Sequence, residues 1–214
     1  MKKIEFIHLD THIKRIHIYP FDLDESADQM AMKGILGTLF QKGEPIFFLC
    51  WREDDFLSHP DRLKLRESIP EYFIENGKYA LIEKGDEERH ACCAMLPLND
   101  STLDCILNLW RYYQSLDFFT PSEELRWERL VLQARKSFKK HFNFGVETNH
   151  WNFICTKGYD GDMLIVTYKQ NTKLPDLKGI VQSFGGEDEE RYDIGNYRSY
   201  FEAFFSFSLD ENKD

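Results

Sequence analysis

The sequence lacks the segments that mark membrane proteins and secreted proteins. No apolar run approaches the roughly 18 residues that a membrane-spanning helix needs. The first ten residues, MKKIEFIHLD, contain neither the apolar core nor the small-residue cleavage site of a signal peptide. The chain has five cysteines, an odd number, and they lie within apolar segments, as reduced and buried thiols do. We therefore expect a cytoplasmic protein that does not bind membranes.

Motifs of common catalytic, phosphate-binding and metal-binding sites are also missing. The chain contains no G-x-x-x-x-G-K-[ST] loop, no G-x-G-x-x-G after an expected strand, no G-x-S-x-G turn and no C-x-x-C pair. We therefore expect no cofactor and no metal, and no known family is recognisable from these residues. An enzyme would need a site assembled from residues far apart in the sequence. Cys50, His90 and Asp160 are then the first residues to examine.

Negative charge dominates the composition, with 37 Asp and Glu against 27 Lys and Arg, a formal net charge of −10. A surface of this sign repels nucleic-acid backbones and suits a partner with a basic surface. With 42% hydrophobic residues, including 18 Phe, the chain can still form a sizeable core. The acidic residues that we expect in exposed binding loops are Glu53, Asp54, Asp55, Asp86, Glu87, Glu88, Glu187, Asp188 and Glu189.

Residues 120–145 contain the clearest helix signal and the main concentration of positive charge. Thr120, Pro121 and Glu123 form a capping box with proline at the first helical position. At 3.6 residues per turn, one face carries a basic stripe, which consists of Arg126, Arg129, Lys136 and Lys140. The stripe is either a contact surface for an anion, a nucleic acid or an acidic protein, or the positive counterpart of the chain's own acidic segments. The net charge favours the second interpretation.

Hydrophobic periodicity and turn residues predict strands that come mostly in hairpins. The expected strands are residues 3–9 and 12–19, 45–52, 79–83 and 89–96, and 151–156 and 163–169. The expected helices are residues 26–41, a short helix from Ser58 to Pro70, 101–113, 120–145 and 174–184. Residues 185–190 read as an acidic loop, and residues 197–207 fit a helix or a strand equally well.

These elements predict an α+β fold with a mostly antiparallel sheet and further short helices. The five-residue gap before Thr120 predicts that helices 101–113 and 120–145 form a central antiparallel pair. Residues 45–52 form a continuous apolar run and predict a central strand that is covered on both faces. We expect a single domain over residues 1–214, with possible sub-lobes 1–100 and 146–208 that are bridged by helices 101–142.

Acidic loops on an aromatic-rich frame, together with the missing catalytic motifs, favour a binding protein over an enzyme. Our leading hypothesis is an inhibitor or immunity-type protein that covers a basic toxin or nuclease. One alternative is a hydrolase-like enzyme built on distant residues. Another is a nucleic-acid binder that uses the basic helix 126–140, which the acidic remainder of the chain disfavours.

Overall fold

A computed structural model gives the fold of the chain. It describes residues 2–8, 13–53, 71–84, 89–113, 115–121, 126–141, 152–158, 161–169, 171–184 and 186–189. The described residues form one nine-stranded sheet with the order β4-β5-β3-β6-β7-β8-β2-β1-β9. Its strands are β1 (Lys3–His8), β2 (Ile13–Tyr19), β3 (Pro45–Glu53), β4 (Lys78–Lys84), β5 (Arg89–Pro97), β6 (Ser115–Phe119), β7 (Phe153–Lys157), β8 (Leu164–Lys169) and β9 (Glu187–Glu189).

Hairpins and helices alternate along the chain in a repeated order. The helices are α1 (Ser26–Leu39), α3 (Asp100–Tyr112), α4 (Trp127–His141) and α5 (Leu177–Ser183), and residues 71–76 are also helical. The predicted hairpins are confirmed as β1–β2, β4–β5 and β7–β8, all antiparallel. Each hairpin is followed by a helix and then a strand, namely α1 and β3, α3 and β6, and α5 and β9. The mostly antiparallel α+β fold is therefore as predicted, and β1–β9 is a parallel pair.

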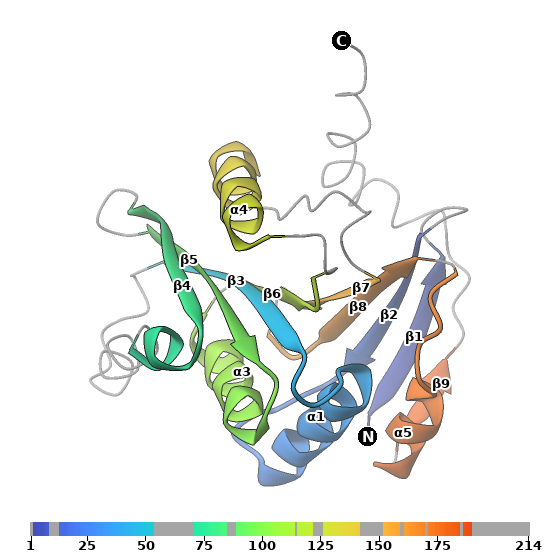
Figure 1. Cartoon of the computed structure of the whole chain (residues 1–214). Helices are drawn as coiled ribbons and strands as arrows, with labels where there is room; N and C mark the ends of the chain where they lie inside the picture. Colours follow the sequence, from blue (N-terminus) through green and yellow to red (C-terminus); the bar gives the residue numbers. More distant parts are fainter. Residues whose placement is uncertain are drawn as a thin grey trace.

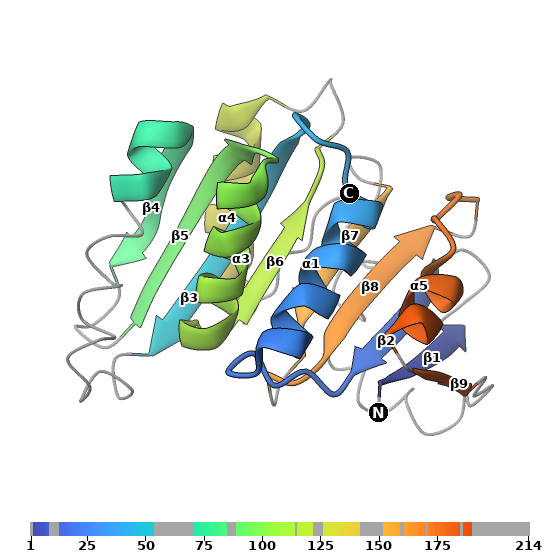
Figure 2. The same cartoon turned by 90° about the horizontal axis from the view of Figure 1, so that it is seen from below.

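The sheet separates two layers of helices (Figure 1). Helices α1, α3 and α5 lie across one face, which we call the three-helix face (Figure 2). Helix α4 lies on the opposite face, which we call the α4 face, where it contacts β4 and β5. Helices α1 and α3 run antiparallel, because Lys33 of α1 pairs with Asp104 near the start of α3, whereas Arg111 near its end contacts Leu23 just before α1.

Strand β3 contributes to a core on each face of the sheet. Successive side chains of a strand point to opposite faces. Ile46, Phe48 and Cys50 accordingly join the main core under the three helices. Phe47 and Leu49 join a second core under α4. All five are nearly or fully buried, so the prediction of a central strand covered on both faces is confirmed.

The predicted antiparallel pair of helices is not present. Residues 115–119, expected as a short connection, form strand β6, which pairs with β3 and with β7 in the middle of the sheet. Helices α3 and α4 consequently lie on opposite faces (Figure 1). Helix α4 begins at Trp127 rather than at Thr120, whose hydroxyl lies 3.5 Å from a Glu44 carboxylate oxygen. Leu116 and Phe118 explain the difference, because they alternate into the main core as strand residues do.

Other local expectations are corrected by the structure as well. Residues expected as an acidic loop include strand β9, whose backbone pairs with β1. Helix α3 begins one residue earlier than expected, since the Asn99 side chain caps it by accepting the Thr102 amide at 2.8 Å. Strands from both predicted sub-lobes belong to the one sheet, through β6. The expected helix from Ser58 and the segment 197–207 lie outside the described residues.

Candidate functional site

The residues named for an enzyme site are not brought together in the described structure. Cys50 is fully buried in β3. A hydrogen bond with Cys92, together with burial, raises the pKa of the Cys50 thiol well above its ordinary value, so the thiol is neutral. His90 lies in β5 with its backbone opposite Arg52, and its side chain is not described. Asp160 lies outside the described residues.

The acidic residues named for binding fall into three groups. Glu53 ends β3, where its backbone is opposite Arg89. Glu187, Asp188 and Glu189 form β9, the outermost strand next to β1 among the described residues. The remaining five, Asp54, Asp55, Asp86, Glu87 and Glu88, lie outside the described residues.

The basic stripe faces away from the sheet. Arg126, just before α4, is exposed, as are Arg129 and Lys136 within the helix. Leu130 and Ala134, on the other side of α4, are fully buried in the second core. Lys140 lies in the helix, and its side chain is not described.

A second acidic surface lies between β2 and α1. Residues 20–25, which we call the anchored acidic segment, alternate between buried and exposed side chains. Phe21 and Leu23 are 3% and 5% exposed. Asp22, Asp24 and Glu25 are exposed, and the Asp24 side chain is 91% exposed in spite of its contact with Arg111. This alternation in PFDLDE is the signal that could have identified the segment.

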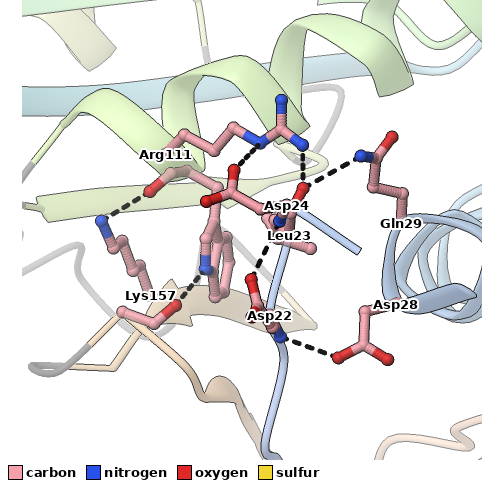
Figure 3. Close-up of polar contacts among 9 residues, drawn as sticks. Asp22, Leu23, Asp24, Asp28, Gln29, Arg111 and Lys157 are labelled. Carbon is pink, nitrogen blue, oxygen red and sulfur yellow. Dashed lines mark hydrogen bonds and ion pairs between the residues drawn. The ribbon is translucent and has the colours of Figure 1, made fainter. Parts of the chain in front are cut away.

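Hydrogen bonds hold the backbone of the anchored acidic segment in place (Figure 3). The Asp22 amide donates to an Asp28 carboxylate oxygen at 2.7 Å, and the Asp24 amide donates to Asp22 Oδ1 at 3.0 Å. The Leu23 carbonyl accepts from Gln29 Nε2 at 3.0 Å and also from the Arg111 guanidinium. The carboxylates are thus presented to solvent from a backbone with few free conformations.

The end of α3, which carries Arg111, supports this segment and is itself held by hydrogen bonds (Figure 3). Lys157 Nζ donates to the carbonyls of Trp110 and Tyr113, at 2.5 and 2.6 Å, and so satisfies the open end of the helix. Trp110 Nε1 donates to the Gly161 carbonyl at 2.7 Å. Burial lowers the pKa of Lys157 to about 8. Since the next residue, Asp162, accepts the Phe21 amide at 2.7 Å, one network joins the β7–β8 turn, α3 and the anchored acidic segment.

The α4 face of the sheet becomes polar beyond the second core. On β2, Ile16 and Ile18 point to the main core, so Arg15 and His17 point to the α4 face. By the same alternation, polar side chains from five neighbouring strands share this face and form what we call the buried polar cluster. Its members are Glu5, Arg15, His17, Tyr19, Asp117, Thr156 and Thr167.

Direct contacts join the members of this cluster. Arg15 Nε donates to Thr167 Oγ1 at 3.0 Å, and Thr156 Oγ1 donates to Asp117 Oδ1 at 2.7 Å. The Tyr19 hydroxyl donates to Glu5 Oε1 at 2.5 Å. Polar groups that are buried in this way remain stable only when they are paired.

Burial shifts the titration of these groups in opposite directions. It raises the pKa of Asp117 to about 6, against the opposing effects of the Thr156 hydrogen bond and the Arg15 charge. Burial and the Arg15 charge lower the pKa of His17 to about 4. Burial also lowers the pKa of Arg15 to about 10, although Asp117 opposes the shift. At neutral pH the cluster therefore contains a neutral imidazole and a mostly ionised Asp117 carboxylate, which takes up a proton near pH 6 rather than near pH 4.

Comparisons with known proteins leave the family open. No protein-family model matches the chain, and no curated protein is significantly similar to it. In the described part of the chain, no three His, Cys, Asp or Glu side chains converge as metal ligands. None of the described helices is both long enough and apolar enough to cross a membrane.

Proposed function

We propose that this protein binds a partner protein with a basic surface and acts as an inhibitor or immunity-type protein. The observation that carries the proposal is the anchored acidic segment, residues 20–25. Three of its side chains, Asp22, Asp24 and Glu25, are exposed carboxylates. Their backbone is held by the network around Arg111. The acidic residues that the sequence analysis named for binding would add further negative charge to the binding surface. Of these, Glu53 and residues 187–189 belong to the described part of the chain.

Preorganisation and charge act together in this proposal. A loop that is already ordered loses little conformational entropy on binding, so more of the contact energy contributes to affinity. Exposed carboxylates also speed the encounter with a basic partner, and salt weakens this steering. We therefore expect fast, salt-sensitive association.

An apolar side chain adjoins the charged segment. Met30, in the second turn of α1, is 64% exposed. It lies four residues after Ser26, about one helical turn, and therefore on the same side of α1 as the first residue of the helix. Methionine is enriched in protein interfaces, where an apolar contact surrounded by charge contributes to affinity. We assign Met30 to the proposed binding surface.

Neutralising the three carboxylates tests the proposal. The variant D22N/D24N/E25Q keeps side-chain size and removes three charges, and the exposed residues changed in E71Q/E75Q/E128Q provide a control with the same change in net charge. Wild type, variant and control are immobilised and exposed to extract of the native cells at low and at high ionic strength. We expect wild type and control to retain a stoichiometric basic protein at low ionic strength, and the variant to lose it. The absence of any stoichiometric partner, or equal retention by all three proteins, contradicts the proposal.

A second candidate function is binding of nucleic acid through α4. The observation in its favour is the solvent exposure of Arg126, Arg129 and Lys136 along one side of the helix. The net charge of −10 opposes it, because most of the surface repels phosphates. Electrophoretic retardation of DNA and RNA at low salt distinguishes the two, since phosphate binding would weaken steeply with salt and would be lost in R126E/R129E.

A further inference from the structure

Two cysteines lie directly opposite each other in the centre of the fold. Cys50 of β3 and Cys92 of β5 are partners in the antiparallel ladder. Their Sγ atoms are 3.3 Å apart, and both thiols are free. Backbone partners in such a ladder are about 4.5–5.5 Å apart at Cα, within the range that a disulfide spans. The sulfur atoms need to approach by about 1.3 Å to reach the bonding distance of about 2.05 Å.

We propose that Cys50 and Cys92 are a modification site, at which a small disulfide such as oxidised glutathione converts the two thiols into a cross-strand disulfide. One protein thiolate attacks the glutathione disulfide, forms a mixed disulfide and releases one glutathione thiolate. The second protein thiolate attacks the sulfur of the first and releases the other glutathione. The protein thus loses two protons and two electrons, and the glutathione disulfide becomes two glutathione thiols.

The edge of the sheet provides the access route to this pair. Cys92 is 6% exposed, whereas Cys50 is 0% exposed. On the side away from β3, Cys92 is the ladder partner of Leu81 in β4, whose side chain is 44% exposed. The β4–β5 register shifts immediately after Leu81, and a bulge of this kind interrupts the ladder of hydrogen bonds. Opening of this edge exposes Cys92 first, so Cys92 takes the glutathione and Cys50 resolves the mixed disulfide.

The other three cysteines are placed less favourably than Cys50 for forming a disulfide with Cys92. Cys93 belongs to the second core, on the opposite face of β5. Cys155 is fully buried in β7. Cys105 of α3 lies in the same main core as Cys92 and is therefore the competing partner for it. Burial, and to a lesser extent the nearby Cys92, raise the pKa of the Cys105 thiol to about 12. Geometry favours Cys50 over Cys105 as the partner of Cys92, because the sulfur atoms of Cys50 and Cys92 are already in contact at 3.3 Å.

Oxidation of the native protein tests the assignment. The folded wild-type chain is incubated with oxidised glutathione and alkylated after denaturation, and its peptides are mapped without reduction. We expect the free thiols to fall from five to three, with one peptide pair joined through Cys50 and Cys92. A joined Cys92–Cys105 pair, or no joined pair under conditions that oxidise the denatured chain, overturns the proposal.

Serine variants separate the two chemical steps. In C50S, Cys92 has lost its resolving partner and should accumulate as the glutathione adduct. In C92S, Cys50 should stay reduced, because it is not the entry point. The matched control C155S should form the same Cys50–Cys92 link as wild type. A glutathione adduct on Cys50 in C92S, formed as fast as that on Cys92 in C50S, refutes the order of attack. Circular dichroism tests whether each variant is folded. If a variant does not fold, the peptide map of the wild-type protein still shows whether Cys50 and Cys92 are linked.

Discussion

Asp117 and His17 should contribute opposite pH dependences to the stability of the fold. For Asp117, the pKa rises on folding from 3.8 to about 6, so its stabilising contribution is complete below pH 3.8 and is lost as pH rises through about 6. For His17, the pKa falls from 6.5 to about 4, so its contribution is complete above pH 6.5 and is lost as pH falls through about 4. Between about pH 4 and pH 6, the contributions of Asp117 and His17 to the stability of the wild-type protein therefore oppose each other.

Each effect is large enough to measure. A tenfold change in proton affinity corresponds to about 1.4 kcal/mol. Because neither titration is complete at the ends of this range, the pKa change of Asp117 favours the folded state by about 2 kcal/mol at pH 4 relative to pH 6.5, and that of His17 disfavours it by about 2.5 kcal/mol over the same interval. Because the two opposing effects are nearly equal, the buried polar cluster should add little net pH dependence to the stability of the wild-type protein. Removing either Asp117 or His17 should reveal the pH dependence that the other group causes.

D117N and H17Q are the variants that separate the two titrations. The amide oxygen introduced by D117N can still accept the Thr156 hydroxyl hydrogen bond, and glutamine is a neutral polar replacement for the imidazole. Urea unfolding at intervals between pH 4 and 6.5 gives the free energy of unfolding of each protein. Relative to wild type, the free energy of unfolding of D117N should fall by about 2 kcal/mol more between pH 6.5 and pH 4, and that of H17Q by about 2.5 kcal/mol less.

The change with pH is the diagnostic quantity, rather than the absolute stability, because D117N also removes the counter-charge of Arg15. The exposed variant E128Q controls for the loss of an ordinary carboxylate. If the free energies of unfolding of D117N and H17Q both change with pH in the same way as that of wild type, Asp117 and His17 do not titrate as argued.

Three further predictions concern the stability of the fold, each measured as the free energy of unfolding in urea. Gly161 has a φ of +78° and a Cβ there would lie 3.2 Å from Lys157, so G161A should destabilise by about 1–2 kcal/mol. G37A, in an open helical position, should instead stabilise by up to about 1 kcal/mol; equal effects would contradict the backbone argument. F48A should cost about 3–5 kcal/mol, because Phe48 is fully buried, and the exposed control M30A less than about 0.5 kcal/mol; a small loss in F48A would mean that the core relaxes. K157M should cost about 1–3 kcal/mol by leaving two helix-end carbonyls without their donor, and an unchanged stability would show that water replaces the ammonium.

Local patterns were sufficient for the elements whose partners are close in sequence. The three hairpins follow from alternating side chains on either side of a short turn. The apolar run at 45–52 identified β3 as a strand covered on both faces. The bounds of helix α1 agree closely with the predicted range, since apolar residues such as Ile35 and Leu39 recur at helical spacing.

Patterns failed where a distant partner decides the conformation. Ser115–Phe119 is too short to be recognised as a strand between two helices, and it becomes one because β3 and β7 offer their edges on either side. Local patterns do not reveal that the anchored acidic segment is held in place, since Arg111, which supports Leu23, lies 88 residues further along the chain. Asp117 and Arg15 are likewise brought near each other only by the order of the strands.

The sequence by itself determined the α+β class, the three hairpins and the net negative charge, because periodicity, turn residues and composition act over a few positions at a time. Only the tertiary structure decided the strand order, the placement of α3 and α4 on opposite faces, and the meeting of Cys50 with Cys92 and of Asp117 with Arg15. Hydrogen bonds between strands are equally available to many partners, so the choice among them depends on which pairing buries the apolar faces of the whole chain together.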